Sequence, residues 1–229
     1  MPRIYKLSRA GLKLLYKIRQ HRGHGIQSPF VFNLVTKVIE EKTLYHAYDD
    51  IEAVLLSSQW NEHCKLNKSN KLFFRLANYF EAKHILEIGS GYGVNTLCLT
   101  APSADIDCVC VEMEEPKYRL ASHLYEKWDR KVALYTGPQL PEIARKQDCI
   151  FIDLANYNFF HTDLNQYLLI LSYENTFIIV KGIRTNTRHQ ALWRGMMNMV
   201  SRTVALDLFN IGILFFDKTL YRWNYKISF

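Results

Sequence analysis

Hydrophobic residues in the first 80 positions recur at intervals of three and four, the spacing of one face of an α-helix. Between Ile4 and Ile18 such a stripe is flanked by basic residues on the other faces, which predicts a basic amphipathic helix. Ser28 precedes a proline, the pattern of a capping hydroxyl before the first helical position, and predicts the start of a second helix. Further helices are predicted over 50–60 and 70–80.

From residue 84 the pattern changes to short β-rich runs separated by helical stretches. Alternation of this kind predicts an α/β fold whose mostly parallel sheet carries helices on both faces. The last two runs are separated only by about Asn210, too little for a crossover helix, so we expect them to pair as a C-terminal antiparallel hairpin. The seven predicted strands cover 84–88, 107–111, 132–135, 149–152, 176–180, 203–209 and 211–216.

Charge is unevenly distributed along the 229 residues. The net charge is +7, and residues 1–24 hold seven basic residues and no acidic one, so the remainder is balanced. A protein that binds nucleic acid over its whole surface would carry positive charge on its folded body, and a disordered chain would lack the 48% hydrophobic content seen here. Both classes are disfavoured, and nucleic acid is an unlikely partner.

A second basic stretch, with no acidic residue between Glu174 and Asp207, follows the predicted fifth strand. It suits an acidic or phosphorylated substrate, or RNA, although no stacking-aromatic motif of an RNA module is present. The alternative is a set of arginines on the outer face of a helix. The residues concerned are Lys181, Arg184, Arg188, Arg194 and Arg202.

Cysteine use and the lengths of apolar runs bear on the compartment. The five cysteines include no C-x-x-C pair, which disfavours both a disulfide framework and a zinc site. No uncharged apolar run approaches the roughly 20 residues of a membrane-spanning helix. We therefore expect a soluble, cytoplasmic protein without a transmembrane segment.

A glycine-rich turn follows the first predicted strand directly, with Gly89, Gly91 and Gly93 in alternate positions. Glycines at such a turn let the backbone swing tightly and approach a ligand. The G-x-G-x-G spacing differs from both the dinucleotide fingerprint and the lysine-bearing phosphate loop, so phosphate binding is the weaker interpretation. A purely structural turn is the alternative.

Two acidic residues accompany this turn. Glu112 ends the next strand about 20 residues further on, where a carboxylate can accept both hydroxyl groups of a ribose. Glu87 ends the first strand beside the loop. The alternative for Glu112 is a surface position in an acidic run. A nucleoside-containing ligand at the carboxyl edge of the sheet is thus predicted.

Together, the acidic residue before the glycine loop, the acid ending strand two and the closing hairpin resemble class I S-adenosylmethionine-dependent methyltransferases. This resemblance covers roughly residues 70–217 and implies a Rossmann-like fold. The run Phe151-Ile152-Asp153, followed by Tyr157, is similar to the catechol O-methyltransferase-like group. Residues 23–30 resemble a segment of an uncharacterised bacterial branch of that group. The chain then divides into an N-terminal helical arm and cap, 1–66, and a methyltransferase domain, 67–229.

The resemblance also implies the cofactor, S-adenosylmethionine, and places its parts. The glycine loop would line the methionine moiety, Glu112 would hold the ribose, Met113 would pack on the adenine, and Asp153 would lie near the transferred methyl group. Glu87 is a further candidate beside the loop. The cofactor-binding candidates are Glu87, Gly89, Ser90, Gly91, Gly93, Glu112, Met113, Gly137 and Asp153.

Metal-dependent members of the resembled group place an Asp-Asn pair after strand five, where this chain has Lys181-Gly182. Neither residue offers the hard oxygen ligand that Mg²⁺ prefers, so we predict no catalytic metal. Asp153 and His24 are the candidate catalytic residues, and Lys181 is a further candidate base.

The favoured hypothesis is an enzyme that transfers a methyl group from S-adenosylmethionine to a small molecule, at oxygen, without a metal. One alternative is a non-catalytic module that binds an acidic partner or a membrane surface through its basic N-terminal helix. Another is an RNA methyltransferase. The amphipathic arm is also of a kind that packs against a second subunit, which leaves a homodimer open.

Overall fold

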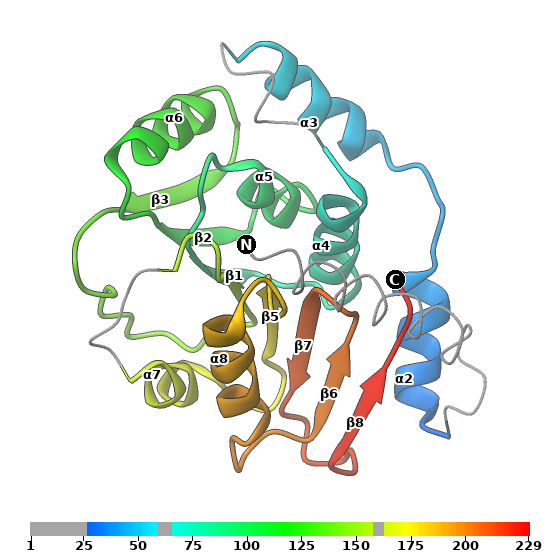
Figure 1. The fold of residues 1–229 in the computed structure, drawn as a ribbon. Helices are drawn as coiled ribbons and strands as arrows, with labels where there is room; N and C mark the ends of the chain where they lie inside the picture. Colours follow the sequence, from blue (N-terminus) through cyan, green and yellow to red (C-terminus); the bar gives the residue numbers. More distant parts are fainter. Residues whose placement is uncertain (1–26, 59–65, 158–162) are drawn as a thin grey trace, which may run out of the picture.

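The computed structural model describes residues 27–58, 66–157 and 163–229, which form a sheet between two layers of helices (Figure 1). Its strands are β1 His84–Ile88, β2 Asp107–Val111, β3 Lys131–Tyr135, β4 Cys149–Asp153, β5 Phe177–Lys181, β6 Val204–Asp207, β7 Ile211–Phe215 and β8 Trp223–Lys226. The helices are α2 Pro29–Leu34, a π-helical turn η1 Val35–Ile39, α3 His46–Leu56, α4 Lys68–Tyr79, α5 Val94–Thr100, α6 Glu115–Glu126, α7 Leu164–Leu171 and α8 Thr187–Met197.

The sheet has the strand order β3-β2-β1-β4-β5-β7-β6-β8. Strands β1 to β5 run parallel, and β7 inserts antiparallel between β5 and β6. The predicted α/β class, the parallel sheet and the closing hairpin are therefore confirmed. An eighth strand, β8, which the sequence pattern did not predict, pairs in parallel with β6 at the edge of the sheet.

Successive residues of each central strand point to opposite faces of the sheet. In β4, Cys149 and Phe151 belong to one apolar core, with α2, η1 and α4. Ile150 and Ile152 belong to the other core, with α7 and α8. Both faces of β4 are buried, which explains why its sequence is apolar at every position before Asp153.

Side-chain caps define two of the early helices. Ser28 accepts a hydrogen bond from the Val31 N–H at the start of α2, as its sequence predicted. Asn67 begins α4 with a capping box that it shares with Asn70. Helix α3 begins at His46, four residues before the predicted position, because Tyr48 already packs inward.

The N-terminal amphipathic helix predicted for residues 4–18 lies outside the described residues. Helices α2 and η1, by contrast, lie within the common core, since Leu34 and Val38 pack in the same cluster as Phe177 of β5. The division into 1–66 and 67–229 stays a prediction. Among the described helices, none combines the length and the apolarity needed to cross a bilayer.

Candidate functional site at the carboxyl edge of the sheet

The glycine loop connects β1 to α5 and is tied to the end of β2. The N–H groups of Gly89 and Ser90 both donate to the Val111 carbonyl oxygen, at 2.8 and 3.1 Å. Gly89 and Gly91 have φ values of +82° and +59°, a region that residues with a Cβ rarely adopt. The loop therefore needs glycine for its own conformation, as well as for any close approach by another group.

Asn156, in the loop after β4, makes that close approach. A Cβ atom on Gly91 would lie 2.8 Å from Asn156 Nδ2, and one on Gly89 would lie 2.9 Å from Asn156 Cβ. Asn156 Oδ1 accepts a hydrogen bond of 2.9 Å from Lys117 Nζ of α6. Sequence analysis missed both residues, because neither belongs to a motif and their proximity to the glycines arises only from the fold.

Glu112 lies where the sequence predicted, directly after β2 and against the glycine loop. Its Oε2 accepts a hydrogen bond of 2.7 Å from the Gly91 N–H, and its Oε1 accepts one of 2.8 Å from the Glu114 N–H. Burial raises the pKa of the Glu112 carboxyl group, while these two donors act in the opposite direction. Glu112 is therefore buried and does not belong to a solvent-exposed acidic run. The backbone of the glycine loop orients its carboxylate.

Glu87 lies beneath the loop. Its carboxylate is fully buried and accepts a hydrogen bond from the hydroxyl group of Thr96, in α5. Burial raises the pKa of Glu87 to about 7. Its other oxygen has no hydrogen-bond partner among the described residues. The contacts of Glu87 are to the protein, so its predicted contact with the cofactor stays a prediction.

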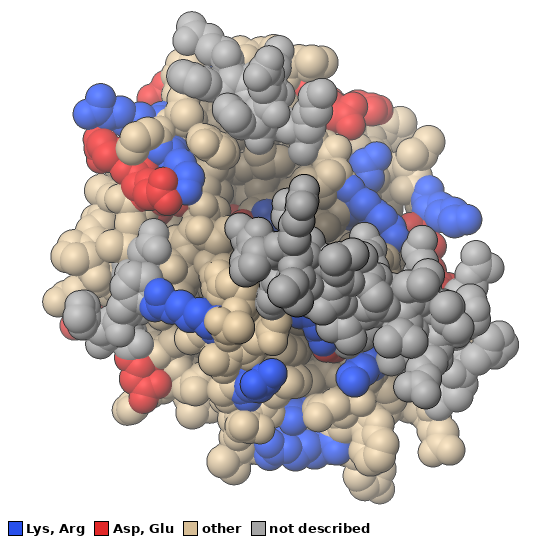
Figure 2. All heavy atoms as spheres, in the orientation of Figure 1, with Lys and Arg blue, Asp and Glu red and all other residues tan. Residues whose placement is uncertain are grey.

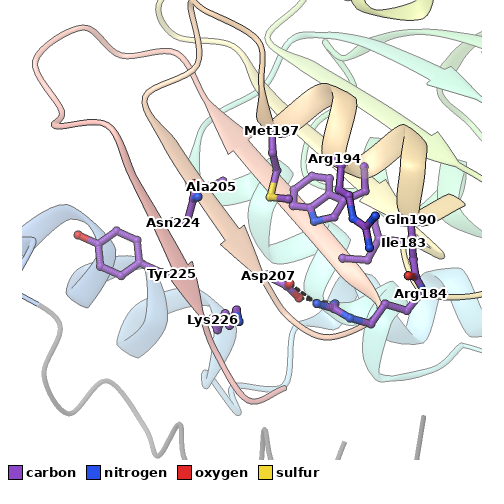
Figure 3. Close-up of a pocket in the computed structure, with 11 residues that line it drawn as sticks. Ile183, Arg184, Gln190, Arg194, Met197, Ala205, Asp207, Asn224, Tyr225 and Lys226 are labelled. Atoms are coloured by element: carbon purple, nitrogen blue, oxygen red, sulfur yellow. Dashed lines mark hydrogen bonds and ion pairs between the residues drawn. The ribbon is translucent and has the colours of Figure 1, made fainter. Parts of the chain in front are cut away.

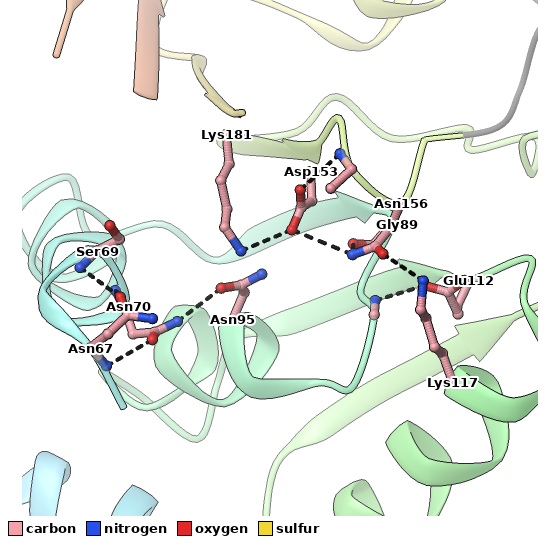
Figure 4. Close-up of polar contacts among 12 residues, drawn as sticks. Asn67, Ser69, Asn70, Gly89, Asn95, Glu112, Lys117, Asp153, Asn156 and Lys181 are labelled. Carbon is pink, nitrogen blue, oxygen red and sulfur yellow. Dashed lines mark hydrogen bonds and ion pairs between the residues drawn. The ribbon is translucent and has the colours of Figure 1, made fainter. Parts of the chain in front are cut away.

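Asp153 and Lys181 occupy paired positions at the carboxyl ends of β4 and β5. Lys181 Nζ lies 2.9 Å from Asp153 Oδ2 (Figure 4). The Ala155 N–H donates to Asp153 Oδ1 at 3.1 Å, and Asn156 Nδ2 donates to Oδ2 at 3.4 Å. The Asp153 side chain is 4% exposed and that of Lys181 is 33% exposed. This pair brings a buried anion and an accessible cation to the edge where open α/β sheets bind ligands.

These contacts do not suit a divalent metal ion beside Asp153. A second oxygen ligand would have to come from the end of β5. Lys181 lies there instead, and its ammonium group contacts the Asp153 carboxylate directly. A metal ion would have to displace this cation and would then keep Asp153 as its sole carboxylate from the two strand ends.

The remaining predicted cofactor residues lie around the same edge, whereas one predicted catalytic residue is not among those described. Ser90 is buried within the loop, and Met113 is half-buried after β2. Gly137, after β3, has nothing within 4 Å of the position of a Cβ atom. His24 lies outside the described residues. Sequence reasoning thus brought together the loop, Glu112 and Asp153, and the structure adds Asn156 and Lys117.

The second basic stretch does not form a single surface patch. Lys181 pairs with Asp153, and Arg184 pairs with Asp207 of β6 (Figure 3). Arg202 is 4% exposed. The Arg184–Asp207 pair borders a cavity of about 250 Å³ beneath α8. In the view of Figure 2, Lys and Arg side chains are dispersed over the lower half of the molecule, with uncharged residues, drawn in tan, between them.

Comparison with known proteins identifies the fold. No family model matches the sequence, and no curated protein matches it. An O-methyltransferase from Bacillus cereus in complex with SAH has 21% identity and a TM-score of 0.51, and the match covers 81% of this chain and 97% of that one.

Two further solved structures match over similar lengths. The SAM-bound O-methyltransferase TomG from Streptomyces achromogenes, involved in tomaymycin synthesis, has 18% identity, a TM-score of 0.53 and coverage of 80% and 94%. An SAH-bound methyltransferase from Podospora anserina has 16% identity, a TM-score of 0.55 and coverage of 82% and 96%. The chain therefore has the same fold as these SAM- and SAH-bound methyltransferases.

Proposed function

We propose that the protein is an S-adenosylmethionine-dependent methyltransferase that methylates an oxygen atom of a small molecule without a divalent metal. The observation that carries this proposal is the Glu112 carboxylate, held against the glycine loop by the Gly91 N–H at 2.7 Å. A carboxylate so placed can accept hydrogen bonds from the two hydroxyl groups of a ribose. The site therefore supplies the carboxylate acceptor that the ribose of a nucleoside-containing cofactor requires.

The solved neighbours support the same cofactor. Several were crystallised with SAM or SAH, and two of those described above are O-methyltransferases. The bound cofactor would supply an activated methyl group on a sulfonium. The protein would contribute binding by the loop and Glu112, together with orientation of the acceptor, which is the main requirement of such a displacement.

Asp153 is less suited to act as a base than its sequence position indicated. Its two oxygens already interact with Lys181, the Ala155 N–H and Asn156. We propose that Asp153 fixes Lys181 and the loop after β4 in place, and that it borders the cofactor through its backbone, which lies beside Gly89.

Titration of the purified protein with SAM, in buffer containing EDTA, tests the proposal. Wild-type protein should bind SAM without added metal. Glu112→Ala should weaken binding by roughly 1–3 kcal/mol, because hydrogen bonds to a charged group are lost. Glu112→Gln, which keeps one acceptor oxygen, should lose less.

Glu52→Ala is the matched control, since Glu52 is exposed on α3. It should bind SAM as the wild type does. No binding by folded wild-type protein would refute the proposed cofactor, and unchanged affinity in Glu112→Ala would show that the ribose site lies elsewhere.

A further inference from the structure

We infer that the Lys181 ammonium group binds the acceptor oxygen in its ionised form, and that the acceptors are compounds with an acidic oxygen, such as phenols, enols or carboxylic acids. This inference rests on the proposed function and specifies its substrate class. It assigns to a side chain of the protein the positive charge that a metal ion would otherwise supply. Lys181 would then be a catalytic residue that touches the reacting oxygen.

The position of Lys181 is the first support. Lys181 ends β5 and faces Asp153 of β4 in register, and the Asp153 carbonyl oxygen lies 3.0 Å from the position of a Cβ atom on Gly89. Strand β4 lies between β5 and β1 in the sheet, so one strand separates the ammonium group from the glycine loop at the edge where the cofactor would bind. Figure 4 shows the side chain pointing from the strand end toward Asp153.

The contacts of the ammonium group are the second support. An ammonium group has three N–H donors, and among the described residues only Asp153 accepts from Lys181. The side chain is one-third exposed, whereas Asp153 is buried. The Lys181 ammonium group can therefore donate to a ligand oxygen on its solvent-exposed side, while its hydrogen bond to the buried Asp153 carboxylate keeps it in place.

The charges around Lys181 are the third support. Asp153 contacts the ammonium group directly, and Glu87 of β1 is close enough for Lys181 to lower the pKa of its carboxyl group. Burial raises the pKa of Glu87 to about 7, so this side chain carries only part of a negative charge at neutral pH. An ionised ligand oxygen would complete the pairing of the exposed side of the ammonium group.

The chemistry of the step follows from this arrangement. The acceptor releases its proton to solvent as it binds beside Lys181, and its oxygen then attacks the methyl carbon. A C–O bond forms while the C–S bond breaks and leaves its electron pair on sulfur, which becomes a neutral thioether. No base within the protein is needed, because the nucleophile is already deprotonated.

The experiment uses 4-nitrophenol as a probe, because its phenolate form absorbs visible light and its ionisation can be read directly. The full chain is saturated with SAH, so that no methyl transfer occurs, and EDTA excludes metal ions. Wild-type protein should lower the apparent pKa of the bound probe by about one unit or more, the effect expected of a cation within a few ångströms. Lys181→Arg should retain most of this shift, and Lys181→Met should abolish it.

Lys181→Met leaves Asp153 buried without its partner, so it could fail to fold. If Lys181→Met does not fold, the double variant Asp153→Asn/Lys181→Met, which removes both charges together, is used in its place. Lys218→Met is the matched control, because Lys218 is exposed on the turn before β8. It should behave as the wild type does.

Binding of SAH, measured for every variant in the same buffer, separates the two proposals. A wild-type protein that fails to bind SAH refutes the proposed function. A wild-type protein that binds SAH but does not bind the probe, or binds it without a pKa shift, overturns the role of Lys181 alone. A shift in the pKa of the bound probe that persists in Asp153→Asn/Lys181→Met also overturns the role of Lys181.

Discussion

The Glu87 carboxyl group lies beneath the glycine loop, with no exposure to solvent. It accepts a hydrogen bond from Thr96 and lies 3.5 Å from the Cys110 sulfur, but no cation contacts it among the described residues. Burial of the charged form without an ion pair is unfavourable, and this raises its pKa to about 7. The residue that begins the loop motif is therefore sensitive to pH near neutrality.

Stability should depend on the charge of Glu87. A group whose pKa is raised by folding binds its proton more tightly in the folded state, so it opposes folding increasingly as pH rises from 4.5 to about 7. Glu87→Gln, which cannot ionise, should gain about 3 kcal/mol relative to the wild type between pH 4 and pH 8. Urea unfolding of both proteins at these two pH values measures the difference.

Glu52→Gln, at an exposed position on α3, is the control for this comparison. It should show the same pH dependence as the wild type. A stability difference between Glu87→Gln and the wild type that stays constant across this pH range would show that folding leaves the pKa of Glu87 unchanged.

Sequence reasoning reached some of the site residues and not others, for a physical reason. Glu112 follows its strand at a fixed distance from the glycine loop, so strand spacing alone placed it. Asn156 and Lys117 are 39 residues apart in sequence, and their hydrogen bond depends on how the loop after β4 and helix α6 pack. Contacts between side chains of different elements leave no local pattern.

Strand β8 depends on one buried arginine. Arg202 Nη1 donates to the Trp223 carbonyl oxygen at 3.2 Å and to Asn224 Oδ1 at 2.6 Å, while Nη2 donates to the Met197 carbonyl oxygen at 2.7 Å. Burial lowers the pKa of Arg202. One side chain thus joins the end of α8 to the edge strand of the sheet.

Loss of this side chain should destabilise the protein without affecting the cofactor site. Arg202→Met removes the guanidinium donors to the Met197 carbonyl oxygen and to Asn224 Oδ1 and should lower the free energy of unfolding by roughly 2–4 kcal/mol. SAM affinity should be unchanged, because β8 lies at the far edge of the sheet from β2. Urea unfolding and SAM titration give the two measurements.

Arg222→Met is the matched control, since Arg222 is exposed and, within the described part of the chain, makes one long hydrogen bond of 3.3 Å, to the Val200 carbonyl oxygen. It should change stability by less than about 0.5 kcal/mol. Equal losses in the two variants would mean that Arg202 contributes no more than an ordinary surface residue.

The hairpin and β8 show which strands a sequence can predict. Strands β6 and β7 are buried throughout and apolar apart from Asp207, and the short connection between them allows only antiparallel pairing. Strand β8 has exposed residues at three of its four positions, so it lacks the alternation of a half-buried strand. It pairs through its backbone, together with the contacts of Arg202, and neither is visible in a hydrophobic pattern.

At the scale of the whole molecule, the early helices and the sheet share one core. Residues of α2 and η1 pack with β1, β4, β5 and β7 in a single cluster, so the predicted cap contributes to the interior of the sheet domain. The five buried residues of this segment are Val31, Leu34, Val35, Val38 and Ile39.

Removal of residues 1–66 should therefore prevent cooperative folding. Full burial of an aliphatic side chain contributes roughly 1.5–3 kcal/mol, so the five residues of α2 and η1 alone approach the total stability of a typical domain, about 5–15 kcal/mol, and the buried residues of α3 are lost with them. Circular dichroism during urea unfolding should show one sharp transition for the full chain and none for residues 67–229. A cooperative transition in 67–229 would show instead that these residues form an independent domain.

The Asp153–Lys181 pair also constrains how this sequence can change over evolutionary time. Replacement of Lys181 by an acid would place two carboxylates side by side, and loss of either partner alone would leave a buried or half-buried charge unpaired. Each single step toward a metal-binding arrangement thus passes through a destabilised protein. The two positions are expected to mutate together, so related sequences should carry either the whole pair or neither member of it.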